Sequence, residues 1–76
     1  MKIKWDIVHD ADDENGVPTV WSTTVGGRFW WICLNSKGEY TCEIKRGGEF
    51  SCVMTCKSLS SAKRWVSINH WKYEGD

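Results

Sequence analysis

The most apolar stretch of this 76-residue chain reads RFWWICL and spans residues 28–34. Turn residues bound it on both sides, because Gly26-Gly27 precede it and the polar run at 35–38 follows it. A short apolar run between turn signals predicts a strand that is buried in a sheet. We expect Gly38 to adopt the left-handed conformation that ends the second turn.

Two further strands are predicted beside this one. Residues 19–25 are rich in β-branched side chains, and residues 40–45 alternate apolar and polar side chains. If a two-residue turn and a three-residue turn connect them to the central strand, then Trp21, Ile32 and Cys42 lie side by side. The even-numbered residues of the central strand then face the core.

The connection to a fourth strand at 50–56 has two solutions. A two-residue glycine loop pairs Ile44 with Ser51, whereas a three-residue loop pairs Ile44 with Cys52. A slip of one residue turns every side chain of a strand to the other face. We prefer the three-residue loop, which places Phe50 and Cys52 on the core face.

The two ends of the chain add a strand and a helix. Residues 3–8 alternate in polarity and predict a half-buried strand, although its place at the sheet edge stays open. Ser58 is a suitable N-cap for a helix. The apolar stripe of this helix has spacings of three and four and comprises Leu59, Ala62, Trp65, Val66 and Asn69. The prediction is a single α+β domain over residues 1–76, an antiparallel β-meander of four to five strands with one C-terminal helix packed on one face.

The outer face of the predicted sheet, away from the helix, has an apolar centre. It carries Phe29, Trp31 and Val53, framed by Glu43 and Lys45. Apolar patches with charged rims and large aromatic side chains are typical anchors of protein interfaces. We predict a partner-binding site at these five residues.

Two other arrangements would also account for this apolar centre. The N-terminal strand or the acidic loop of residues 10–16 could fold over the patch. Alternatively, the patch could meet a second copy of the chain in a homodimer.

The charges of the chain cancel overall but are unevenly placed. Ten basic and ten acidic side chains leave no net charge, whereas a dedicated phosphate-backbone binder usually carries a positive field. Five of the ten acidic residues precede Gly16, and most cations lie in the second half. An alternative site, for nucleic acid, would therefore use Lys45, Arg46, Lys63 and Arg64.

The composition predicts a self-sufficient small core. Six tryptophans, two tyrosines and two phenylalanines supply enough apolar surface without metals or crosslinks. The first residues carry charges, with no apolar run of the kind that signal peptides and membrane spans have. We expect a cytoplasmic protein without a membrane partner, in which the four cysteines stay reduced.

No catalytic, metal or cofactor site is predicted. The acidic run from Asp10 misses the calcium-loop pattern, because Gly16 falls one position too late. Cys33, Cys42 and Cys52 come from three successive strands rather than from the close Cys pairs of structural zinc sites. The sequence also lacks a nucleophile elbow and a phosphate-binding loop. We therefore expect neither an enzyme nor a bound cofactor.

The second half of the chain carries a resemblance to known families. Three short strands at 28–34, 40–45 and 50–56 run into the helix start Ser58-Leu59-x-x-Ala62-Lys63. This pattern resembles the three-stranded sheet plus helix of AP2-type DNA-binding domains and of the arm-binding domains of phage integrases. It is also similar to many small β-meander-plus-helix proteins of phages and mobile elements. The resemblance covers about the last 45 residues and bears on the fold more than on the activity.

The resemblance implies two classes of function. One is a small inhibitor or adaptor that binds a host or defence-system protein by surface contact, as anti-CRISPR and other anti-defence proteins do. The other is an accessory DNA-binding module. Net neutrality and the apolar outer patch favour the first class.

Overall fold

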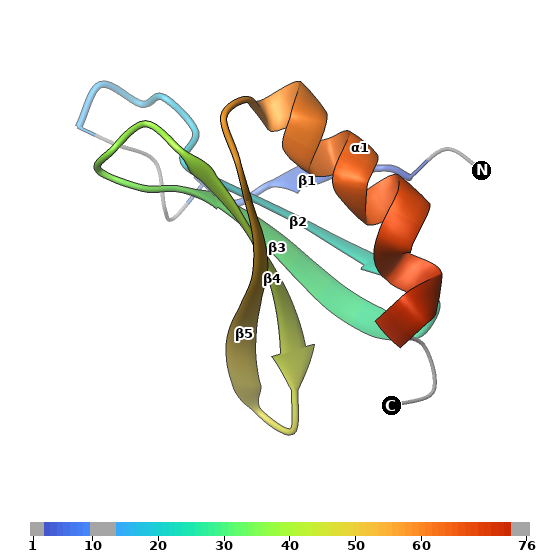
Figure 1. Ribbon diagram of the computed structural model, residues 1–76. Coiled ribbons are helices and arrows are strands. Elements are labelled where there is room, and N and C mark those ends of the chain that lie inside the picture. The colour runs from blue at the N-terminus through green and yellow to red at the C-terminus, as the bar shows by residue number, and fades with distance from the viewer. Residues whose placement is uncertain (1–2, 10–13, 74–76) are drawn as a thin grey trace.

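We describe residues 3–9 and 14–73 of a computed structural model. Five strands form one antiparallel sheet in sequence order, and a helix follows them (Figure 1). The elements are β1 (Asp6–Ile7), β2 (Val20–Val25), β3 (Arg28–Leu34), β4 (Tyr40–Arg46), β5 (Glu49–Cys56), α1 (Leu59–Asn69) and the 3-10 helix η2 (His70–Tyr73). The predicted α+β meander with one C-terminal helix is confirmed.

The N-terminal segment joins the sheet edge. Only Asp6 and Ile7 form a ladder with β2, so this strand is shorter than predicted. The Thr23 hydroxyl donates a hydrogen bond to the Lys4 carbonyl at 2.7 Å. This bond holds the segment just before β1 against β2. β1 therefore extends the sheet beside β2 instead of lying across its outer face. Residues 10–13 of the predicted acidic loop lie outside the described residues.

The first two hairpins have the predicted register. Trp21 pairs with Ile32 across the glycine turn, and Ile32 pairs with Cys42 across the next turn. Gly38 has φ +79°, the left-handed value expected of it, and its N–H donates to the Asn35 carbonyl at 3.1 Å. Apolar side chains of the central strands therefore alternate toward one face.

The third hairpin corrects the prediction at its turn. Gly47 and Gly48 form a two-residue loop with φ +56° and +90°, values that favour glycine. Ile44 consequently pairs with Ser51, and Lys45 pairs with Phe50. The predicted three-residue loop is wrong. Phe50 lies on the outer face with Lys45, and not in the core.

A β-bulge then reverses the phase of β5. Glu43 pairs with Cys52, whereas Cys42 pairs with Met54, so Val53 is an extra residue without a partner in β4. Beyond the bulge, Cys42 pairs with Met54 and Tyr40 with Cys56, as the three-residue loop would also have placed them. Cys52 lies on the outer face and is exposed, contrary to its predicted place in the core. The extra residue shifts the second half of β5 by one position. Its side chains therefore face the same sides of the sheet as they would with a longer loop at the turn.

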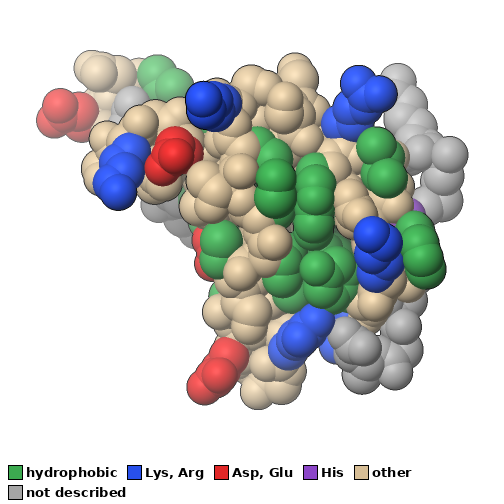
Figure 2. All heavy atoms as spheres, viewed as in Figure 1, with side chains coloured by type: hydrophobic (Ala, Val, Ile, Leu, Met, Phe, Trp, Pro, Cys, Tyr) green, Lys and Arg blue, Asp and Glu red, His purple; other side chains and the backbone are tan. Residues whose placement is uncertain are grey.

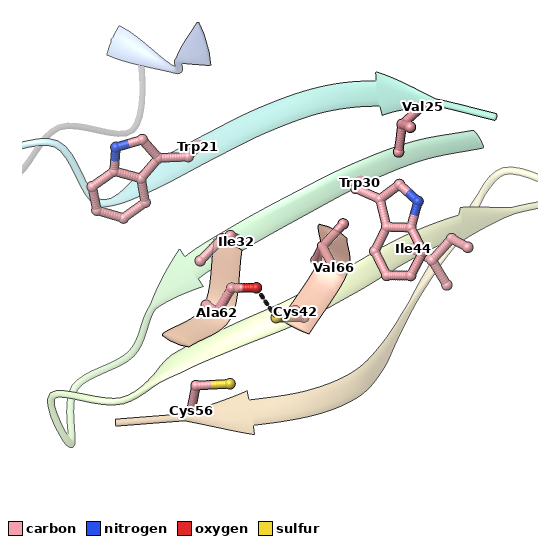
Figure 3. Close-up of a cluster of buried hydrophobic side chains, with 9 residues drawn as sticks. All are labelled: Trp21, Val25, Trp30, Ile32, Cys42, Ile44, Cys56, Ala62 and Val66. Atoms are coloured by element: carbon pink, nitrogen blue, oxygen red, sulfur yellow. Dashed lines mark hydrogen bonds between the residues drawn. The ribbon is translucent and has the colours of Figure 1, made fainter. Parts of the chain in front are cut away.

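Helix α1 crosses one face of the sheet and completes the core (Figure 1). Ser58 caps it as predicted, because its Oγ accepts the Ser61 N–H at 3.1 Å. Ala62 and Val66 are the buried residues of its predicted stripe. Figure 3 shows nine buried side chains that converge between sheet and helix: Trp21, Val25, Trp30, Ile32, Cys42, Ile44, Cys56, Ala62 and Val66.

Aromatic contacts fasten the end of the helix to the sheet. The fully buried Trp30 ring lies edge-on to Trp65 at 6.1 Å and to Tyr73 at 5.4 Å between centroids. The Arg28 side chain donates from Nε to the Tyr73 carbonyl at 3.1 Å. These contacts hold α1 and η2 on the inner face, and neither described helix lies on the outer face.

Candidate protein-binding surface

Three aromatic side chains form a cluster on the outer face of the sheet. Ring centroids of Phe29 and Trp31 are 5.9 Å apart, those of Phe29 and Phe50 are 6.2 Å apart, and those of Trp31 and Phe50 are 4.9 Å apart. All three pairs are tilted or edge-on, the geometry that aromatic rings prefer. We call these three residues the aromatic cluster.

The register explains why these rings meet although they come from β3 and β5. Phe29 and Trp31 are odd-numbered residues of β3, and the side chain of Trp30 between them points into the core. β4 separates the two strands and contributes Glu43 and Lys45 to the same face. The aromatic rings thus reach across the intervening strand.

The cluster is partly open to solvent. Phe29 and Trp31 are half-buried, while Phe50 at the end of the sheet remains 41% exposed. The indole Nε1 of Trp31 is buried without a hydrogen-bond partner among the described residues. The rings cover one another, and no described strand or helix lies over them.

Two charged residues, predicted to frame the patch, lie on β4, between the two strands that carry the rings. Glu43 pairs with Trp31 in the ladder, and its carboxylate accepts the Thr41 hydroxyl at 3.2 Å. Lys45 is exposed beside Phe50. A negative and a positive side chain therefore lie next to the rings, and polar and aromatic groups alternate on this face.

Val53 lies elsewhere than predicted. As the extra residue of the bulge it is half-buried and packs against the core cluster, and it has no place in the aromatic cluster. Sequence reasoning missed Phe50 for the same reason. The signal was available in Gly47-Gly48, which matches the glycine pair of the first hairpin and favours a two-residue turn.

The four cations predicted for nucleic acid are not brought together. Lys45 lies on the outer face, whereas the Arg46 guanidinium lies 5.3 Å from the centre of the Tyr73 ring near the end of the helix. Lys63 and Arg64 belong to α1, which covers the inner face. These four cations therefore do not form the row along one face that would bind a phosphate backbone.

The cysteines are divided between the two faces. On the outer face, burial and then the neighbouring Glu43 carboxylate raise the pKa of Cys33 to about 12. On the inner face, burial and then Cys56 raise the pKa of Cys42 to about 12. Thiols with such pKa values are protonated near neutral pH and are poor nucleophiles and metal ligands. No group of three metal-ligating side chains occurs within residues 3–9 and 14–73.

A second feature, which sequence reasoning did not find, is an open groove of about 270 Å³ between β5 and α1. Figure 2 shows hydrophobic side chains gathered between these two elements, with basic side chains at the margins. The groove is lined by Met54, Cys56, Ser61, Arg64, Trp65, Ile68 and Asn69. A clue in the sequence was Ile68, an apolar residue that lies off the predicted helix stripe.

Comparison with known proteins gives this chain no relative. No protein-family model matches it, and no curated protein or solved structure does so. Within the described part of the chain, no helix has the length and apolar character needed to cross a membrane. The fold and the aromatic cluster are therefore the observations from which a function is inferred.

Proposed function

We propose that this chain is a small non-enzymatic module that binds a partner protein through its outer sheet face. The observation that carries the proposal is the contact of Phe29, Trp31 and Phe50 on the face that α1 leaves uncovered. Large aromatic side chains dominate the energetics of many protein interfaces because they bury much area at little cost in entropy.

Charge and chemistry support the same proposal. The chain has no net charge, and one carboxylate and one ammonium group, those of Glu43 and Lys45, lie beside the cluster. A neutral, aromatic surface suits contact with a folded protein. The class of function is an inhibitor or adaptor that acts by surface contact, with a host or defence-system protein as partner. Accessory DNA binding is the weaker candidate, because Glu43 occupies the middle of this face.

The test uses a photo-crosslinking phenylalanine analogue in place of Phe50 in the full chain. Irradiation in a lysate of the source organism, followed by mass spectrometry, identifies proteins that touch the cluster itself. The binding constant is then measured with the purified partner. We expect Phe50→Ser to weaken binding at least about tenfold, as loss of an interface anchor does.

Trp71→Ser is the matched control. Trp71 is 62% exposed and belongs to η2, on the helical side of the molecule. Unchanged binding by Trp71→Ser together with loss by Phe50→Ser supports the proposal. Equal binding by both variants would refute it, and a crosslink to a second copy of the chain would replace it with a homodimer. Retention of a DNA duplex at about 50 mM salt, lost as salt rises, would favour the DNA-binding alternative.

A further inference from the structure

The groove between β5 and α1 lies on the helical side of the molecule, away from the aromatic cluster. Met54 on β5 and Ile68 on α1 are its exposed apolar walls, with 39% and 57% of their surfaces accessible. Trp65 also lines the groove, and its ring contacts those of Trp30 at 6.1 Å and Tyr73 at 6.3 Å between centroids. An unbranched methionine beside a fixed indole adapts to different apolar side chains.

Among the described residues, the charged side chains at the groove are basic. Arg64 lines it, and Lys57 follows directly after the lining residue Cys56. Between Phe50 and Tyr73 the sequence contains four lysines and arginines and no aspartate or glutamate. In Figure 2 basic side chains lie above, below and to the right of the apolar centre, and no acidic side chain is seen over α1. This field attracts an acidic partner.

We propose that this groove binds an acidic peptide segment of a partner protein, which inserts one or two large apolar side chains between β5 and α1. The volume of about 270 Å³ falls just below the roughly 300–1,000 Å³ of small-molecule sites. It suits side chains presented on a peptide. The cations at the rim pair with carboxylates on either side of the inserted residue.

Two observations favour an inserted peptide side chain over a stacked nucleic-acid base or an added strand. Trp65 already contacts Trp30 and Tyr73, with ring centroids at 6.1 Å and 6.3 Å, so only part of its ring surface is left for a nucleic-acid base to stack on. The bulge at Val53 interrupts the regular hydrogen-bonding edge of β5. A partner strand could not pair along the whole of β5, so insertion of side chains is favoured over strand addition.

This proposal does not rest on the function proposed above. It concerns the opposite side of the molecule, and either surface can bind without the other. If both bind, the chain is an adaptor that holds two partners on opposite faces of one sheet.

The experiment selects random 12-residue peptides, displayed on phage, against the immobilised full chain. We expect the enriched peptides to carry net negative charge and at least one large apolar residue. Binding of a synthetic copy of the most enriched peptide should fall at least tenfold for Ile68→Asp and for Arg64→Glu. Both side chains are exposed, so these variants should fold, which circular dichroism verifies.

The matched controls make a charge reversal and an apolar-to-polar change at exposed positions outside the groove. Lys37→Glu reverses an exposed charge in the β3–β4 turn, and Phe50→Ser removes an exposed apolar side chain on the outer face. Both should bind the peptide as the unmodified chain does. Arg64→Glu should in addition select basic peptides in a fresh screen, because reversal of a rim charge reverses the preference.

Several results would overturn the proposal. They are the absence of enrichment, enriched peptides without acidic bias, and peptide binding that is unaffected by Ile68→Asp. If a twelve-nucleotide oligo-dT strand displaces the peptide and binds at least as tightly as the peptide does, the groove is a nucleic-acid site. A dimer in solution that Ile68→Asp dissociates would assign it to a second copy of the chain.

Discussion

The Phe50 ring lies 4.9 Å from the Trp31 ring, although the two residues belong to strands that are separated by β4. The contact exists because the Gly47-Gly48 turn sets the first half of β5 in a register that turns Phe50 outward. The aromatic cluster is therefore a consequence of a two-residue turn.

The bulge at Val53 gives β5 a different role in its second half. Before the bulge Phe50 faces outward, whereas after it Met54 and Cys56 face α1. A single extra residue thus supplies apolar side chains to both faces of the sheet. The aromatic cluster thus depends on the turn, whereas the groove beside α1 depends on the bulge.

The first prediction concerns the turn that sets the register. A Cβ at Gly47 would meet no atom within 4 Å, so a substitution there is limited by its positive φ alone. We expect Gly47→Val to lower the free energy of unfolding by roughly 1–2 kcal/mol. Gly47→Asn should be close to neutral, because asparagine tolerates the left-handed conformation. Urea denaturation measures both, and equal stability of the two variants would contradict a left-handed turn.

The central strands could be predicted from the sequence, and the end of the sheet could not. Trp30 and Ile32 alternate with outward residues between two clear turns, which leaves one register that buries them. For Phe50 two sequence signals disagree. The Gly47-Gly48 turn favours a register in which Phe50 faces outward, whereas the residues after Val53 favour a register in which it would face the core. A bulge resolves the conflict. The alternation of apolar and polar residues in one sequence does not reveal an extra residue inside a strand.

The second prediction concerns the anchor of the core. Trp30 is fully buried and contacts both Trp65 and Tyr73 edge-on. We expect Trp30→Ala to cost about 3–5 kcal/mol, enough to unfold a domain of this size in a large fraction of molecules. Thermal denaturation followed by circular dichroism measures the loss.

Trp71→Ala is the matched control for the core prediction. The side chain of Trp71 is 62% exposed and has Lys72 at 5.8 Å from its ring centre. Its removal should change the free energy of unfolding by no more than about 0.5 kcal/mol. A similar loss for both variants would mean that Trp30 does not anchor the core.

The third prediction concerns the start of α1. The Ser58 hydroxyl accepts the Ser61 N–H at 3.1 Å and donates to the Ser61 hydroxyl at 2.9 Å. We expect Ser58→Ala to lower the free energy of unfolding by about 1 kcal/mol, because the first turn loses its cap. Ser60→Ala, at an exposed position of the same turn, should be neutral or slightly stabilising. Chemical denaturation that ranks the two variants in the opposite order would exclude a capping role for Ser58.

The fourth prediction is a loss of stability at alkaline pH. The pKa values of Cys33 and Cys42 rise from 9.0 to about 12 in the folded chain, chiefly through burial. Well below pH 9 both thiols are protonated whether the chain is folded or unfolded, and they contribute no pH dependence. Between pH 9 and 12 the unfolded chain loses these protons while the folded chain retains them. The folded state then binds more protons, so stability falls as pH rises.

The measurement compares the unmodified chain with Cys42→Ala between pH 8 and about 10.5, within the window set by the two pKa values. Urea midpoints should decline more steeply with pH for the unmodified chain, because the variant has one buried thiol fewer to hold protonated. All other ionisable groups are common to both proteins, so their effects cancel in the comparison. Parallel declines would show that the Cys42 thiol ionises as readily in the folded chain as in the unfolded one.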